Sequence, residues 1–433
     1  MTQSGHPEAG AAPRVAVTSL GCKVNFAEMS ELAGTLAAAG WDVVAEQDHA
    51  DVRILNSCTV TMQADATTRK HLRRLRRADP GALLVLTGCS VDGNPDQFSR
   101  DASRRHGVDA VYPNLRKHEI ADDLLRWVGA REAAPDTGED RSALRSRAFI
   151  KVQDGCNHRC TYCIVWQARG VARSRGPASV SDAVARAIEL GHGEVTLCGV
   201  DLGSYGRDLG TDLATLLGGL LEQCSDSARI RLSSINANDV TPAVIELNAH
   251  PRLCAHWHLP LQSGSDPVLR RMHRGYRRAQ YLHVVRQLRE RNPLTEITTD
   301  VMVGFPGETD ADHEQTLSLI DEVGFHSCHV FRWSPRPGTP ATEYADPVDA
   351  ATSRRRSAEV RRAALRAGDA SRQRAVGRAH EVVWERPAST GARGLSSTYH
   401  EIEVPGASPP PGSLGHVFVT AVAGDHLEGT LIP

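Results

Sequence analysis

GCNHRCTYC (residues 155–163) follows FIKVQD (149–154), a run typical of a buried strand. Its three cysteines, Cys156, Cys160 and Cys163, stand in the spacing C-x3-C-x2-C. Three thiolates on one tight loop can bind three irons of a 4Fe–4S cube and leave the fourth iron open to a further ligand. The unequal gaps favour such a cluster, and a zinc site stays open as the alternative.

The region around this loop, residues 148–372, alternates between strand patterns and helical patterns. Short runs rich in β-branched residues are separated by helical stretches such as 179–190 and 213–224. The six expected strands cover residues 148–153, 194–197, 230–232, 255–260, 297–303 and 327–331. The class is therefore α/β, and six units predict a partial (β/α)6 barrel rather than a full eight-stranded one.

A second, smaller alternation of strands and helices occupies residues 14–128 and predicts an N-terminal parallel α/β domain. Three of its expected strands are each followed by a loop with one cysteine, namely Cys22, Cys58 and Cys89. Since the carboxyl ends of parallel strands meet at one edge of a sheet, these thiols are expected to converge. Their positions favour metal ligands over three separately buried cysteines.

The remaining segments complete the predicted domain order. Residues 129–147 are polar and are interpreted as an inter-domain linker. A helix rich in Arg and Ala is expected over 351–376. Short strand patterns between Pro, Gly and Ser clusters then predict a small β-barrel over 376–433.

Composition and charge restrict the partners and the cellular compartment that are expected for this chain. The net charge is −2, so no global basic field points to a nucleic acid. No apolar run reaches the roughly 18 residues of a membrane span, and no secretory signal is recognised. We expect a cytoplasmic monomer with reduced cysteines. Four of the ten cysteines have no mutual spacing and are interpreted as packing residues, namely Cys198, Cys224, Cys254 and Cys328.

Several longer strings resemble those of a known family. GCNHRCTYC resembles the signature of radical S-adenosylmethionine (SAM) enzymes. Strings similar to the methylthiotransferase branch of that group are ARG (168–170), HLPLQSGS (258–265), TDVMVGFPGE (299–308) and FRWSPRPGTP (331–340). The resemblance extends over nearly the whole chain. It implies that a cluster on Cys156, Cys160 and Cys163 binds SAM at its open iron and cleaves it reductively to a 5′-deoxyadenosyl radical.

The resemblance also implies a second 4Fe–4S cluster, held by Cys22, Cys58 and Cys89, which carries the sulfur of the methylthio group. A second SAM supplies the methyl group, and a flavodoxin- or ferredoxin-type protein is the implied reductant.

Five residues at strand ends are candidates for contacting SAM: Gly199, Ser233, Ser234, Gln262 and Asp300. The glycine permits close approach of the methionine part, and the two serines are placed to bond the ribose. Ordinary loop capping is the alternative for the last two residues.

Known methylthiotransferases fall into three substrate branches. Two act on the adenosine 3′ of a tRNA anticodon, which carries an isopentenyl or a threonylcarbamoyl group, and the third acts on an aspartate of a ribosomal protein. GCKVN (21–25) and NSCTVT (56–61) resemble the threonylcarbamoyladenosine branch. The implied partner is therefore a tRNA anticodon stem–loop.

Two further features fit an RNA partner. The β-barrel, with GLSSTY (394–399), resembles the OB-like TRAM domain, which is associated with RNA binding. A basic helix is expected to neutralise phosphates through Arg69, Lys70, Arg73, Arg74 and Arg77. A solvated charged face is the plainer interpretation of that helix.

Near the expected site, Trp166, Gln167 and Asn236 depart from the family pattern. They leave the cofactor chemistry intact and keep other substrates open: isopentenyladenosine in tRNA, a ribosomal-protein aspartate or a small metabolite. A non-catalytic RNA-binding protein with structural clusters is the alternative from another class.

Overall fold

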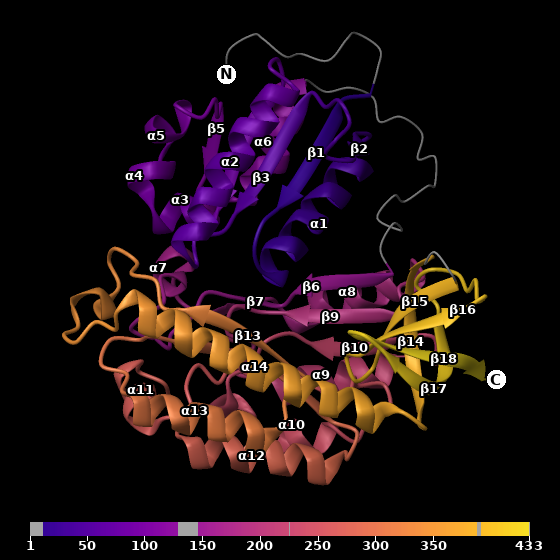
Figure 1. Cartoon of the computed structure of the whole chain (residues 1–433). Coiled ribbons are helices and arrows are strands. Elements are labelled where there is room, and N and C mark those ends of the chain that lie inside the picture. Colours follow the sequence, from indigo (N-terminus) through magenta and orange to yellow (C-terminus); the bar gives the residue numbers. More distant parts are fainter. Residues whose placement is uncertain (1–11, 129–145, 225, 388–390, 433) are drawn as a thin grey trace.

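The computed structural model describes residues 12–128, 146–224, 226–387 and 391–432, which form three regions in chain order (Figure 1). The predicted linker, 129–147, lies outside the described residues for most of its length, so the domain limits stay a prediction. The α/β class, the partial barrel and the C-terminal β-barrel are confirmed.

The N-terminal region is a five-stranded parallel sheet in the order β2-β1-β3-β4-β5. Its strands are β1 (Arg14–Ser19), β2 (Asp42–Val44), β3 (Val52–Ser57), β4 (Leu83–Gly88) and β5 (Ala110–Tyr112). The helices are α1 (Lys23–Ala38), α2 (Met62–Ala78), α3 (Cys89–Gly93), α4 (Pro95–Phe98), α5 (Arg100–Arg104) and α6 (Glu119–Val128). The central strands β3 and β4 are buried throughout, as expected for a parallel sheet covered on both faces.

The sequence pattern predicts the first helix over residues 28–39, but helix α1 begins at Lys23, five residues earlier. The extra turn packs outside its own sheet: Val24 and Ala27 are buried against Cys198 of the second region. This tertiary contact extends the helix where the local pattern gave no signal. Cys198 has the packing role predicted for it.

The second region holds the six predicted strands as a curved, all-parallel partial barrel. They are β6 (Arg147–Lys151), β9 (Glu194–Cys198), β10 (Arg229–Leu232), β11 (His256–His258), β12 (Glu296–Val303) and β13 (Ser327–Arg332). Two three-stranded ladders, β10-β9-β6 and β11-β12-β13, are joined by isolated parallel bridges such as Ser234 with His258. A short antiparallel pair, β7 (Gln153–Asp154) and β8 (Arg173–Ser174), follows β6.

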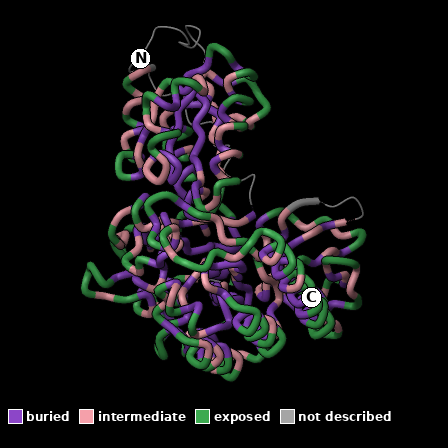
Figure 2. Tube along the Cα trace, turned by 60° about the vertical axis from the view of Figure 1, so that its left-hand side comes forward, coloured by how far each residue is buried: buried purple, intermediate pink, exposed green. Residues whose placement is uncertain are grey.

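Helices cover the outer face of the barrel strands (Figure 1). They are α8 (Pro177–Glu189), α9 (Leu213–Gln223), α10 (Pro242–Leu247), α11 (Asp266–Arg271), α12 (Arg278–Arg291), α13 (Asp310–Val323) and α14 (Ala350–Ala375). Short helical turns of this region are α7 (Val165–Arg169), η3 (Leu202–Ser204), η4 (Ala237–Asp239) and η5 (Pro340–Glu343), and a further turn, η1 (Asn114–Arg116), precedes α6 in the N-terminal region. The largest apolar core lies between these strands and helices, and Figure 2 shows the buried trace running through its centre.

The C-terminal region is a closed barrel in the order β14-β15-β16-β18-β17. Its strands are β14 (Ala379–Pro387), β15 (Gly391–Ser396), β16 (Glu401–Pro405), β17 (Leu414–Ala423) and β18 (His426–Ile432). The strand patterns of the sequence, at residues 381–385, 399–404 and 416–422, correspond to β14, β16 and β17, whereas β15 and β18 were not predicted. Each missed strand contains a glycine where backbones approach closely: a Cβ at Gly394 would lie 2.5 Å from the Val383 carbonyl oxygen.

The three regions pack directly on one another. Helix α1 contacts β6, and α3 contacts α7, so the N-terminal region packs against the first barrel strand and against the helical turn after the cysteine loop (Figure 1). On the other side, Arg229 and Arg231 of β10 donate to backbone carbonyls of the C-terminal barrel. Glu194 lies between both arginines and completes this buried junction. Among the described helices, none combines the length and apolarity needed to cross a membrane.

Candidate iron–sulfur site

The loop with Cys156, Cys160 and Cys163 lies between β7 and α7, after the first barrel strand. Its entry requires glycine, because Gly155 has a φ of 73° and a Cβ there would lie 2.0 Å from a carbonyl oxygen. The middle is fixed by Thr161, whose N–H donates to the Met272 carbonyl. The loop is therefore held from several sides before any cofactor binds.

Each sulfur of this loop accepts at least one N–H group. The backbone N–H of His158 points at the Cys156 sulfur at 3.5 Å, and that of Val165 points at the Cys163 sulfur at 3.4 Å. The Arg274 guanidinium donates to the Cys160 sulfur at 3.4 Å. Such bonds are favourable to thiolates and are among the interactions that tune iron–sulfur clusters. The donor set of this loop therefore fits a cluster.

Burial raises the pKa of Cys156 and of Cys163 to about 12. As free thiols, both would stay protonated at neutral pH. A bound metal removes those protons, since a coordinating thiol is deprotonated outright. The chemistry of this loop therefore fits metal ligation better than nucleophilic catalysis.

The structure brings Cys22, Cys58 and Cys89 together at the carboxyl edge of the N-terminal sheet. A Cβ at Gly21 would lie 2.8 Å from the Cys58 sulfur, so the first two loops touch. The pKa of Cys58 is raised to about 11, chiefly by burial and further by its neighbours Cys89 and Cys22. Cys22 is exposed and Cys89 is buried, so the group opens on one side. The role of these thiols as ligands stays a prediction.

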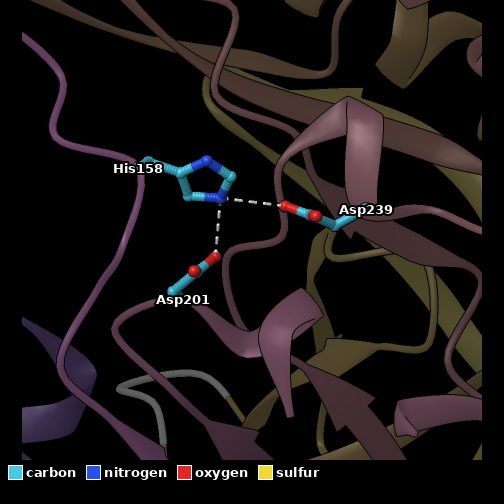
Figure 3. A group of neighbouring side chains, drawn as sticks. All are labelled: His158, Asp201 and Asp239. Atoms are coloured by element: carbon cyan, nitrogen blue, oxygen red, sulfur yellow. Dashed lines mark hydrogen bonds and ion pairs between the residues drawn. The ribbon is translucent and has the colours of Figure 1, made fainter. Parts of the chain in front are cut away.

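The loop of residues 155–163, which carries Cys156, Cys160 and Cys163, is called the radical loop below. A three-residue cluster that joins this loop to two neighbouring segments was not predicted from the sequence (Figure 3). His158 Nε2 lies 3.1 Å from Asp201 Oδ1, after β9, and 3.1 Å from Asp239 Oδ2, in η4. Hydrogen bonds from the imidazole to these carboxylates raise the pKa of His158 to about 10. The pair of ionic contacts holds the loop against the segments that follow β9 and β10. No local motif joins these residues, so no sequence signal identifies them.

The candidate SAM residues lie at barrel strand ends in two pairs. The Gly199 N–H donates to Ser233 Oγ at 3.4 Å, and a Cβ on that glycine would lie 2.9 Å from Leu202 Cα. Gln262 donates its backbone N–H to the Asp300 carbonyl. Ser234 bridges to the neighbouring strand at His258, which also pairs with the Asp300 carboxylate at 3.3 Å. These bonds agree in part with loop capping, and contact with SAM stays a prediction.

The three residues that depart from the family pattern are integrated into the site. Gln167 donates to the Gly338 carbonyl at 2.7 Å, which ties α7 to the segment after β13. Trp166 lies beneath the Arg159 guanidinium. Asn236 accepts from Arg274, the same arginine that contacts Cys160. The changes therefore reach the cluster loop itself.

Helix α2 presents most of the predicted RNA-binding side chains to solvent. Lys70, Arg73 and Arg77 are exposed and lie on one face, three and four residues apart. Arg74 is paired with Glu46, and Arg69 is half-buried, so the positive face is narrower than predicted. Binding of RNA by this helix stays a prediction.

A three-cysteine loop after the first strand of a six-stranded parallel partial barrel defines the class of radical SAM enzymes. Residues 150–320 match the family model of the radical SAM superfamily, and residues 14–110 match that described as "Uncharacterized protein family UPF0004". The fold is similar to that of the radical SAM methyltransferase TsrM from Kitasatospora setae, with a TM-score of 0.55, 15% identity and 77% of each chain covered.

Curated relatives show which family of radical SAM enzymes the chain is similar to. The chain is 36% identical over 385 residues to the threonylcarbamoyladenosine tRNA methylthiotransferase MtaB of Thermotoga maritima, covering 86% of each chain. It is 34% identical to MtaB of Bacillus subtilis, covering 77% of this chain and 76% of that one. It is 32% identical to the tRNA-2-methylthio-N(6)-dimethylallyladenosine synthase of Desulforamulus reducens, covering 96% and 95%. The chain belongs to the radical SAM methylthiotransferase family and is an enzyme of that type, with a 4Fe–4S cluster and SAM as its cofactors.

Proposed function

We propose that this enzyme installs the 2-methylthio group on N6-threonylcarbamoyladenosine 3′ of the tRNA anticodon, using two 4Fe–4S clusters and two SAM molecules. The proposal rests on one observation: the two three-cysteine sets lie on either side of the contact between α3, which begins at Cys89, and α7, which follows Cys163. The names of the relatives from Thermotoga maritima and Bacillus subtilis support the substrate.

The cluster on Cys156, Cys160 and Cys163 is called the first cluster. The residues of the radical loop and those at the barrel strand ends would have different roles there. When bound, that cluster supplies an electron and an open iron site for the methionine end of SAM. Cys156, Cys160 and Cys163 hold it, and Arg274 directs positive charge at one of its sulfurs. The strand ends at Gly199 and Asp300 provide the surface on which the rest of SAM would lie.

The N-terminal set would hold the second cluster. Its exposed member, Cys22, leaves one side of the site open, whereas Cys89 is buried against α7. An open side is what delivery of sulfur to a large substrate requires. Because α7 follows directly on the radical loop, the radical and the sulfur would be presented to the same substrate carbon.

The surface beside the two sets fits a single-stranded RNA loop. A hollow of about 550 Å³ between the start of α2 and the end of β13 is lined by Gln63, Phe331, Arg332 and Trp333, among others. Phe331 is 39% exposed and offers a ring on which a base can stack. The basic face of α2 leads away from this hollow and would follow the phosphates. We place the enzyme in the cytoplasm as a monomer, reduced by a flavodoxin- or ferredoxin-type protein.

The substrate is tested by mass spectrometry of nucleosides from tRNA of a deletion strain. We expect the 2-methylthio form of N6-threonylcarbamoyladenosine to disappear and its precursor to accumulate, with recovery on expression of the wild-type chain. The relative from Desulforamulus reducens favours a second candidate, the isopentenylated (dimethylallyl) adenosine. Loss of the 2-methylthio form of that nucleoside instead would move the enzyme to this branch, and unchanged levels of both 2-methylthio nucleosides would overturn a tRNA substrate.

A further inference from the structure

Arg169 is the last residue of α7 and lies at the contact between the two cysteine sets. Only 1% of its surface is exposed, which is unusual for a charged side chain. A buried charge is tolerated when it is paired and hydrogen-bonded. Its partners therefore indicate what the position is for.

All five N–H donors of the Arg169 guanidinium have acceptors. Nε donates to the Cys89 sulfur at 3.2 Å, and Nη2 donates to Asn25 Oδ1 at 2.6 Å. Nη1 donates to Glu28 and to Asp154 Oδ1 at 2.9 and 2.8 Å, and Nη2 also reaches Glu28 at 3.2 Å. One planar group thus joins a cysteine of the N-terminal set to acids of both regions.

Asn25 extends this reach to the other two cysteine loops. Its side-chain amide donates to the carbonyls of Leu20 and Ser57, both at 2.9 Å. These carbonyls stand just before the loops that carry Cys22 and Cys58. Arg169 therefore holds the Cys89 loop by a direct hydrogen bond and the Cys22 and Cys58 loops through Asn25.

Asp154 extends the same network to the radical loop. Its Oδ1 accepts the Gly155 N–H at 2.8 Å, immediately before Cys156. Arg169 itself lies six positions after Cys163, at the far end of the same loop and helix. The guanidinium therefore joins the two ends of the radical loop and connects them to the N-terminal set.

The charges of this network leave an excess of positive charge. It contains two carboxylates, Glu28 and Asp154, and four cations, Arg169, Lys117, Lys151 and Arg173. The two surplus cations, Lys151 and Arg173, have 26% and 38% of their side chains exposed, whereas the buried members, Glu28, Asp154, Arg169 and Lys117, balance in charge. The buried cation that faces a thiol is Arg169, and its Nε–H toward Cys89 is favourable when that sulfur is anionic, as in a thiolate that carries a metal cluster.

We propose that Arg169 is a positioning residue that holds the N-terminal cysteine set in register with the radical loop and raises the reduction potential of the second cluster through its bond to Cys89. The inference rests on the proposed two-cluster function. Removing a cation next to a cluster stabilises its oxidised state, so the potential falls when this residue is neutralised.

The experiment compares wild type, R169Q and R169K as full-length chains reconstituted without oxygen. To observe the second cluster alone, the same changes are placed in a C156A/C160A/C163A background, and its potential is measured by spectroelectrochemistry. R53Q is the matched control, because Arg53 is an equally buried arginine of the N-terminal region that pairs with Asp79 and contacts no sulfur.

For R169Q we expect a more negative potential of the second cluster with 5′-deoxyadenosine production retained. The methylthio product formed per 5′-deoxyadenosine falls roughly ten- to hundredfold, the usual effect of removing a partner of a metal ligand. R169K keeps the positive charge but lacks the planar, five-donor guanidinium. Relative to R169Q, we expect it to restore part of the wild-type potential and little of the wild-type product ratio. R53Q should match wild type in both measurements.

The outcomes separate the inference from the function beneath it. If wild type holds only about four irons per chain, the two-cluster function fails and the inference with it. If wild type holds about eight and R169Q matches its potential and product ratio, only the role of Arg169 is overturned. Should R169Q fail to fold, R169K decides alone: both clusters bound, with the second potential and the product ratio of the wild type, would contradict the proposal.

Discussion

The two cysteine sets of this enzyme are built in opposite ways. Cys156, Cys160 and Cys163 belong to one loop, so their mutual positions depend on a short piece of chain and a few bonds that anchor it. Cys22, Cys58 and Cys89 come from three strand ends and meet only when the N-terminal sheet has folded. A local set tolerates loosening of the surrounding fold, whereas an assembled set does not.

The strongest test of this contrast removes one cysteine from each set. C156A should abolish 5′-deoxyadenosine formation, because the open-site cluster loses a ligand and the radical has no other source. C89A should leave 5′-deoxyadenosine formation intact and abolish the methylthio product. Both products are measured by liquid chromatography and mass spectrometry after reaction with SAM and reductant. C254S is the control, because Cys254 is buried beside Glu194, at the junction with the C-terminal barrel. Loss of the radical product in C89A would show that the sets are not separable.

A smaller effect is expected when the assembled set is loosened from outside. Arg336, after β13, is buried and pairs with Asp65 at 2.6 Å, and it also donates to Thr59, the residue after Cys58. R336A leaves Asp65 buried without its charge partner, which costs about 3–5 kcal/mol. We expect iron to leave the N-terminal set at lower denaturant concentration while the radical loop keeps its own.

The control for that variant is R355A, which removes exposed ion pairs with Asp310 and Glu359. Exposed pairs of this kind contribute about 0–1 kcal/mol. Iron release is followed by absorbance during a denaturant titration. Simultaneous release from both sets in R336A would contradict the view that the assembled set is the weaker one.

A change at His158, which holds the radical loop against Asp201 and Asp239, should instead affect the set formed by one loop, namely Cys156, Cys160 and Cys163. H158N removes the positive charge between Asp201 and Asp239 and weakens two partly buried hydrogen bonds, which costs about 1–3 kcal/mol. We expect iron affinity of the radical loop to fall roughly tenfold, as for other partners of metal ligands. Iron in the N-terminal set should be unchanged.

R207A is the companion variant, because Arg207 contacts Asp239 at 2.8 Å from a largely exposed position. Its effect should be smaller than that of H158N. Iron and sulfide analysis of both variants, with and without C22A/C58A/C89A, assigns each loss to one set. An equal loss in R207A would show that charge near Asp239, rather than the hold of His158 on the loop, governs iron binding.

The same contrast explains what the sequence could predict. The radical loop and the six barrel strands depend on local spacing and periodicity, and both were predicted. The convergence of Cys22, Cys58 and Cys89 followed from a general rule for parallel sheets. The bond from Arg169 to Glu28 spans 141 positions, and His158 meets Asp239 across 81. Such contacts depend on how regions pack, and single-sequence patterns carry no record of that packing.

The smallest effect is expected at the C-terminal barrel, which contributes no cysteine to either set. His326 and His400 face each other where this barrel meets β13. Burial, together with the nearby Arg372, lowers the pKa of His326 to about 4, and burial with neighbouring histidines lowers that of His400 to about 2. Both side chains are therefore neutral in the folded chain at neutral pH.

Unfolded histidines take up protons as the pH falls below 6.5, whereas the folded ones do not until the pH is much lower. The stabilisation is thus fully present above pH 6.5 and is lost progressively as the pH falls below that value. Between pH 7.5 and 5.5, linkage predicts a loss of about 1 kcal/mol for each histidine. Thermal unfolding of the wild type should shift accordingly, and H400Q should show a shallower pH dependence, whereas H416Q, at an exposed position, should not. Since neither cysteine set contacts this junction, iron content should stay constant over the same range; iron loss in step with the thermal shift would mean that the assembled set depends on all three regions.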